Sequence, residues 1–113
     1  MRKILLGVTL VALVGGLGAA KAENKKVLMF TKSAGFQHSV VKRGENDALG
    51  QAEKTVVELG KKNGFDVTVT KDGTLLSPEN LKKYDAVYFF TQGEIDQPGL
   101  DKNPPVKAEE KSA

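Results

Sequence analysis

The 113-residue sequence contains no cysteine, and its only histidine is His38. Without cysteine the chain has no disulfide, no thiolate zinc site and no cysteine nucleophile, and no lipid can be attached at a cysteine. A single imidazole holds a transition metal only if other ligands join it, and the nearest loop candidates are Glu94 and Asp96. We therefore expect no metal site and no cofactor.

The first segment has the pattern of a secretory signal peptide. Residues 1–22 combine a basic start, an apolar run from Ile4 to Ala19 and the small-residue motif Ala20-Lys21-Ala22 before Glu23. The apolar run is shorter than the ~20 residues that span a bilayer. We expect cleavage after Ala22, no stable membrane anchor after cleavage, and a periplasmic or secreted protein. The alternative is an uncleaved anchor.

Residues 23–113 also have no excess of charge of either sign. The full sequence has 17 basic and 14 acidic residues, and removing Arg2, Lys3 and Lys21 with the signal peptide leaves 14 of each. A balanced charge gives no reason to expect a nucleic acid or an anionic membrane as a partner.

Hydrophobic patterns in residues 23–95 alternate between strand and helix periods, which predicts a single small domain. A β-α-β-α-β order implies parallel pairing with right-handed crossovers. We predict an incomplete α/β, flavodoxin-like sheet with about three strands in the order 2-1-3. Residues 96–113 are expected to form a polar, proline-containing tail that is the start of a truncated helix. The strands are expected at Lys26–Thr31, Phe65–Thr70 and Asp85–Thr91, and the helices at Asn46–Asn63 and Ser77–Tyr84.

The ends of these helices carry recognisable signals. Asn46 or Asp47 is expected to cap the first helix, and Asn63-Gly64 to end it. Ser77 and Pro78 are expected to start the second helix. The apolar stripe that we expect to be buried along the first helix consists of Leu49, Ala52, Val56 and Leu59.

Two polar segments, Thr31–Ser39 and Thr91–Glu94, follow the first and third predicted strands. In parallel α/β sheets, ligands bind beyond the carboxyl ends of the strands where the strand order reverses. The first segment matches no phosphate-binding loop. It does offer hydroxyl groups, one cation and a glycine that allows close backbone approach. Its candidate ligand contacts are Thr31, Lys32, Gly35 and Ser39.

His38 lies in the same segment, and two roles fit it. Imidazole titrates near neutral pH, so His38 is the candidate catalytic residue, acting as a general base. Alternatively, its side chain hydrogen-bonds the start of the following helix and shapes the loop.

The stretches "KVLMFTKSAGFQHSVVKRG" and "SPENLKKYDAVYFFTQGE" resemble the beginning of ThuA-like, or trehalose-utilisation, domains. The resemblance covers Lys26 to about the end of the chain. It implies a fold similar to class I glutamine amidotransferases and a role in the utilisation of trehalose and related carbohydrates, with a small sugar as partner. It also implies a pocket lined by Gly35, Phe36 and His38 on one side. The residues opposite would be Gln92, Gly93 and Glu94.

Domains of this family are much longer than the present chain. The strand that carries the nucleophile in their amidotransferase relatives has no counterpart here. We therefore expect an N-terminal fragment that is not catalytically complete alone, with uncovered sheet surface that favours self-association. The alternative is a non-catalytic module that binds a carbohydrate or another small ligand.

Overall fold

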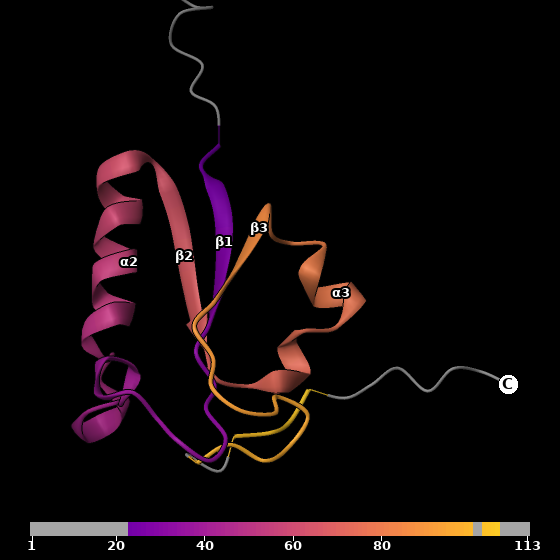
Figure 1. The fold of residues 1–113 in the computed structure, drawn as a ribbon. Helices are drawn as coiled ribbons and strands as arrows, with labels where there is room; N and C mark the ends of the chain where they lie inside the picture. The colour runs from indigo at the N-terminus through magenta and orange to yellow at the C-terminus, as the bar shows by residue number, and fades with distance from the viewer. Residues whose placement is uncertain (1–22, 101–102, 107–113) are drawn as a thin grey trace, which may run out of the picture.

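Three parallel strands form the sheet in the order β2-β1-β3. The computed structural model describes residues 23–100 and 103–106. The predicted α/β class, the parallel pairing and the 2-1-3 order are confirmed (Figure 1). The predicted signal peptide and parts of the predicted tail lie outside the described residues. The strands are β1 (Lys25–Phe30), β2 (Phe65–Thr70) and β3 (Ala86–Phe89).

Helices lie on opposite sides of this sheet (Figure 1). α2 (Gln51–Asn63) links β1 to β2, and α3 (Pro78–Leu81) belongs to the link from β2 to β3. The two crossovers run in opposite directions across the sheet, and right-handed crossovers then place their helices on opposite faces. Three short 3₁₀ turns complete the described structure: η1 (Ser39–Val41), η2 (Glu45–Asp47) and η3 (Gly73–Leu75).

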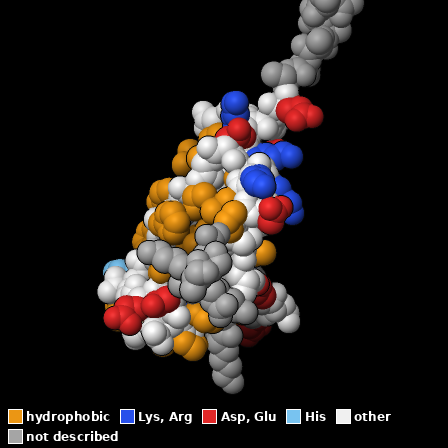
Figure 2. Space-filling view, turned by 90° about the vertical axis from the view of Figure 1, so that its right-hand side faces the viewer, with side chains coloured by type: hydrophobic (Ala, Val, Ile, Leu, Met, Phe, Trp, Pro, Cys, Tyr) orange, Lys and Arg blue, Asp and Glu red, His pale blue; other side chains and the backbone are white. Residues whose placement is uncertain are grey.

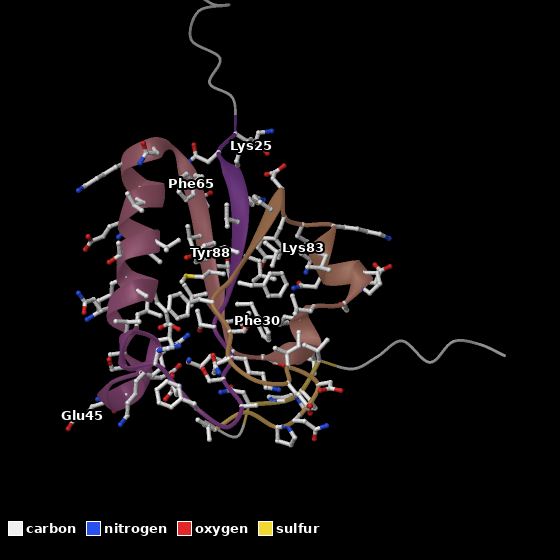
Figure 3. The ribbon with its side chains drawn as sticks, viewed as in Figure 1. Lys25, Phe30, Glu45, Phe65, Lys83 and Tyr88 are labelled. Atoms are coloured by element: carbon white, nitrogen blue, oxygen red, sulfur yellow. The ribbon has the colours of Figure 1, made fainter. Side chains whose placement is uncertain are left out.

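The core centres on β1, the middle strand. Leu28, Met29 and Phe30 are fully buried, because β1 has a strand on each side and side chains cover both of its faces. Phe30 points to the α3 side of the sheet, where its ring meets Phe89 edge-on at 5.9 Å between centroids (Figure 3). Successive side chains of a strand point to opposite faces, so a strand that is buried on both faces has apolar residues at consecutive positions.

The first helix begins later than the sequence predicted. It starts at Gln51, with Gly50 as its N-cap, and not near Asn46. Asn46 and Asp47 have φ angles of 54° and 59°, a left-handed conformation that a right-handed helix cannot contain. Both residues belong to η2, so the expected cap at either position is wrong. The predicted end at Gly64 is confirmed by its φ of 77°.

The buried side of α2 also differs from the predicted apolar stripe. Leu59 is 47% exposed, whereas Glu53 is fully buried. Gly60 is also buried, and a Cβ added to it would lie 3.0 Å from Cγ2 of Val67 in β2. The helix is rotated to bring a glycine against the strand and a carboxylate inside, which hydrophobicity alone does not predict.

The last helix and strand are shorter than predicted. α3 ends at Leu81, and β3 covers Ala86–Phe89 instead of residues 85–91. The start is as expected: Ser77 Oγ accepts a hydrogen bond from Asn80 N (3.3 Å), and Pro78 opens the helix.

Strand β3 leaves aromatic side chains exposed. Parallel neighbours in register point to the same face, so Tyr88 shares its face with Met29 and Phe89 shares its face with Phe30. Because α2 contacts β2 at the far edge, Tyr88 stays 45% exposed, and Phe89 is 52% exposed. Hydrophobic side chains gather on the molecular face shown in Figure 2. Both faces of this edge strand are therefore only partly covered.

Candidate functional site

The two polar segments predicted to face each other do lie side by side. Ser33 and Gln92 form a parallel β-bridge beyond the ends of β1 and β3. Ala34 N donates to Gln92 O at 2.7 Å, and Gln92 N donates to Lys32 O at 3.4 Å. The pairing of adjacent parallel strands thus continues into the loops, at the place where the strand order reverses.

Gly93 makes this close approach possible. Its φ is 76°, and an added Cβ would overlap the carbonyl oxygen of Ala34. Gly35 also has a positive φ, 89°, but a Cβ there would meet no atom within 4 Å. Both glycines shape the loops, yet only Gly93 is needed for contact between them.

An exposed aromatic pair follows the joined loops. The rings of Phe36 and His38 meet edge-on, with centroids 5.0 Å apart, and His38 also lies 6.0 Å from the ring of Phe90. Phe36 is 59% exposed, and His38 is exposed as well. This is an apolar surface with a polar imidazole beside it. The other exposed candidates are Ser39, Gln92 and Glu94.

His38 does not play the structural role considered from the sequence. It is the N-cap residue of η1, but its side chain makes no capping hydrogen bond. The cap contact comes from the backbone, where His38 O accepts from Val41 N at 3.1 Å. Within residues 23–100 and 103–106, the imidazole contacts aromatic rings and makes no hydrogen bond or ion pair.

Thr31 and Lys32, two of the predicted ligand contacts, are inside the protein. Thr31 is 0% and Lys32 1% exposed. Thr31 Oγ1 donates to Glu53 Oε1 at 2.6 Å. Ser33 is buried too, and its Oγ has no hydrogen-bond partner in the described part of the chain. The polar atoms of Thr31 and Lys32 are thus committed to the fold, and the exposed part of the candidate site begins at Gly35.

The Lys32 ammonium fastens a distant segment to the end of β1. Its Nζ donates to the carbonyl oxygens of Ile95 (3.1 Å) and Pro104 (3.2 Å), and also to that of Gln97. Burial lowers the pKa of Lys32 below the usual lysine value, and the nearby carboxylates of Asp96 and Asp72 partly offset this. The side chain therefore holds the segment after β3 against the strand ends.

Replacing Lys32 with methionine is expected to loosen this segment. The substitution keeps most of the side-chain volume but removes three hydrogen bonds from Nζ. The oxygens of Ile95 and Pro104 keep backbone donors, Val106 N and Gly73 N, whereas that of Gln97 keeps none among the described residues. We expect the unfolding free energy to fall by about 1–2 kcal/mol, because the lost hydrogen bonds outweigh the relief of burying a charge. Urea unfolding followed by circular dichroism measures the loss, with exposed Lys54→Met as the matched control.

The pH dependence of the unfolding free energy distinguishes the role of Lys32 as a buried ionisable group from a role in packing alone. Between the lowered pKa of Lys32 and the usual value of 10.5, the unfolded chain binds more protons than the folded one. The unfolding free energy therefore rises with pH across that alkaline window. Lys32→Met should remove this rise, and an identical pH profile in both proteins would contradict the assignment.

Glu53 is the centre of a buried charge network that the sequence did not reveal. Its Oε2 accepts from Gly50 N at 2.8 Å and lies 2.7 Å from Arg43 Nε. Its Oε1 accepts from Thr31 Oγ1 and lies 3.9 Å from Lys71 Nζ. A glutamate three residues after the cap of a helix is a known capping arrangement, and this was the available signal.

Arg43 and Lys71 are held on several sides. Arg43 Nη1 lies 3.0 Å from Asp47 Oδ2, in addition to the Nε contact with Glu53. Lys71 Nζ donates to Thr31 O and Val41 O, each at 2.9 Å. The network ties the loop after β1, the start of α2 and the end of β2 into one unit.

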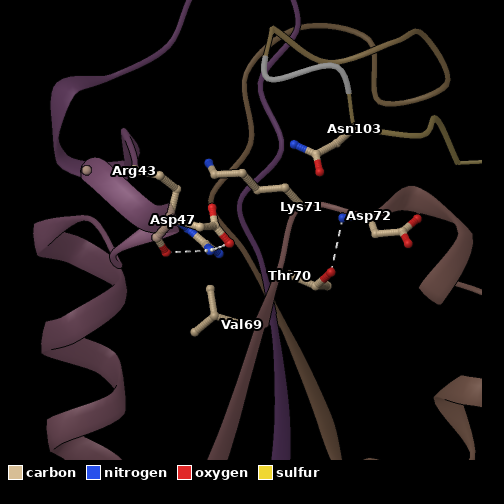
Figure 4. A pocket seen from close by; sticks show the side chains of 8 residues that line it. Arg43, Asp47, Val69, Thr70, Lys71, Asp72 and Asn103 are labelled. Carbon is tan, nitrogen blue, oxygen red and sulfur yellow. Dashed lines mark hydrogen bonds and ion pairs between the residues drawn. The ribbon is translucent and has the colours of Figure 1, made fainter.

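An open pocket of about 470 Å³ lies beside this network (Figure 4). It sits at the carboxyl end of β2, and its described lining includes none of the predicted catalytic or ligand-binding residues. Its lining comes from Arg43, Gly44, Asp47, Val69, Thr70, Lys71, Asp72 and Asn103.

Other kinds of site find no support in the described residues. No group of three or more histidine and acidic side chains is placed to share a metal ion within residues 23–100 and 103–106. In the same ranges, no helix has the length and apolar character needed to cross a bilayer. Comparisons of the chain with protein-family models, curated proteins and solved structures found no match.

Proposed function

We propose that this chain is an exported ThuA-like domain related to carbohydrate utilisation, and that it binds a small sugar beyond the carboxyl ends of β1 and β3. The observation that carries the proposal is the joining of segments 31–39 and 91–94 through the Ser33–Gln92 bridge. This junction lies where parallel α/β sheets bind their ligands.

The exposed residues of the junction suit a sugar. Phe36 offers an apolar ring to the C–H face of a pyranose, and His38 stands beside it with both ring nitrogens available for hydroxyl groups. Gln92 and Glu94 add an amide and a carboxylate from the neighbouring loop, both exposed.

Binding suits this arrangement better than catalysis by the described residues. A catalytic base is normally oriented by a third group, and the imidazole of His38 makes no hydrogen bond or ion pair within the part of the chain that the structure describes. His38 therefore contributes to ligand recognition. The same observation favours the second candidate function, a non-catalytic module for carbohydrates or other small ligands.

The proposal is tested by titrating the protein with trehalose and glucose. His38 is the only histidine, so its imidazole signals in a proton NMR spectrum report directly on the site. We expect them to shift on sugar addition, and we expect Phe36→Ala to weaken binding about tenfold because a stacking surface is lost.

The matched control is Leu59→Ala, which removes another exposed apolar side chain, on α2. Equal weakening in both variants, or histidine signals that do not move with either sugar, would contradict the proposed site. Export through residues 1–22 and self-association through the exposed β3 edge remain predictions.

A further inference from the structure

The pocket at the carboxyl end of β2 has the properties of a second binding site. Its volume of about 470 Å³ is within the ~300–1,000 Å³ range of small-ligand sites. Its described walls come from three separate parts of the chain: the turn before α2, residues 69–72 at and after the end of β2, and Asn103 (Figure 4). It shares no lining residue with the loop face that carries Phe36 and His38.

The wall nearest α2 is fixed before any ligand arrives. The side chains of Arg43 and Lys71 are only 15% and 4% exposed. Glu53 pairs with both of them, and Lys71 also donates to two backbone carbonyls. Side chains held in this way lose little conformational freedom when a ligand binds, which favours affinity.

The charges around the pocket disfavour an anionic ligand. The cations are Arg43 and Lys71, and both are paired with the buried carboxylate of Glu53. Asp47 and Asp72 line the pocket itself. Among the described residues, three carboxylates thus stand against two cations, which makes the pocket less favourable for a phosphate or carboxylate ligand.

Several polar atoms of the lining remain available to a neutral ligand. Both hydrogen bonds to the Asp72 carboxylate, from Thr74 N and Thr74 Oγ1, use Oδ1, so Oδ2 has no hydrogen bond from residues 23–100 and 103–106. Thr70 Oγ1 accepts from Asp72 N at 3.0 Å, and its own proton has no acceptor among the described residues. The contacts of Asp47 with Arg43 use Oδ2 and the backbone oxygen, so Oδ1 makes none within the described part of the chain.

We propose that this pocket binds a neutral polyhydroxylated molecule of monosaccharide size. Hydroxyl groups donate and accept at once, which matches a lining where free carboxylate oxygens accept and a threonine hydroxyl donates. Val69 supplies an apolar patch for the ring carbons. The site goes beyond the proposed function, since it needs neither the loop face nor a family relationship.

The test is a titration of the full chain with D-glucose, followed by backbone amide shifts in a ¹⁵N-correlated NMR spectrum. We expect concentration-dependent shifts at residues 43–47 and 69–72. Asp72→Asn is the decisive variant: it retains the Oδ1 acceptor that caps η3 but turns the free Oδ2 acceptor into a donor. Binding of D-glucose should weaken about tenfold.

Asp66→Asn is the matched control, because Asp66 lies at the opposite end of β2 and should leave the affinity unchanged. Asp47→Asn serves as a second variant; asparagine tolerates the positive φ of this position, so the fold is retained. Weaker binding in this variant supports the site.

Three outcomes would overturn the proposal. One is the absence of shifts at residues 43–47 and 69–72 at glucose concentrations far above the millimolar range. Another is tighter binding of inorganic phosphate than of D-glucose at these residues. The third is unchanged affinity in Asp72→Asn. Phe36→Ala distinguishes the two sites: shifts at 69–72 that persist in this variant support the pocket, and their loss would assign the glucose response to the loop face.

Discussion

Replacing Glu53 with glutamine is expected to remove about 3–5 kcal/mol of unfolding free energy, the largest effect of any single substitution considered for this chain. The carboxylate is fully buried and faces Arg43 and Lys71. An amide of the same shape removes the buried negative charge that faces Arg43 and Lys71 and turns one oxygen acceptor into a donor. A loss of this size is a large share of the ~5–15 kcal/mol that holds a typical domain together.

Urea unfolding of the two proteins, followed by circular dichroism, measures this loss. Glu58→Gln is the matched control, because Glu58 is exposed on the same helix and should change stability by less than about 0.5 kcal/mol. If the unfolding free energies of Glu53→Gln and the wild type differ by less than about 1 kcal/mol, the network does not provide the stability assigned to it.

Replacing Gly93 with alanine is expected to separate the two loops of the candidate site. The residue has a φ of 76°, and its added Cβ would overlap the carbonyl oxygen of Ala34. The left-handed conformation alone costs alanine about 1–2 kcal/mol. Relief of the overlap requires movement of backbone atoms, which breaks the 2.7 Å hydrogen bond from Ala34 N to Gln92 O. We expect a total loss of about 3 kcal/mol.

Gly35→Ala isolates the effect of the close approach. Gly35 also has a positive φ, but an added Cβ there meets nothing within 4 Å. This control should show the backbone strain only, without faster hydrogen exchange at the amide of Ala34. Equal losses of stability in the two variants, with Ala34 equally protected, would mean that the loops do not depend on Gly93 for their contact.

Gly93 and Glu53, the residues with the two largest expected effects, differ in how well the sequence alone predicts their importance. Gly93 was included among the candidate site residues through the resemblance, and the structure gives it a reason of its own in the contact with Ala34. Glu53 was not among the residues predicted to matter from the sequence. Its importance depends on Arg43, Lys71 and Thr31, which reach it from three other segments.

Short-range patterns in the sequence determined the order of elements, the parallel sheet and several element ends. The alternation of apolar and polar residues in Phe65–Thr70 is typical of a strand that is exposed on one face, and β2 is an edge strand. The signals at Gly64 and Ser77 are local, because a left-handed residue ends a helix and a serine side chain caps one within a single turn. All the groups that form such a helix end lie within a few residues of each other, so the sequence alone predicts it.

Only the tertiary structure decided which charged side chains lie inside. Lys32, Glu53 and Lys71 are all at most 5% exposed, and each is satisfied by atoms far away in the sequence. Burial of a charge is favourable only where partners converge on it, and no window of neighbouring residues contains that information. The same tertiary contacts account for the orientation of α2 and for its start at Gln51, because the helix places Glu53 next to Arg43 and Lys71. The pocket beside Arg43 lies next to these contacts.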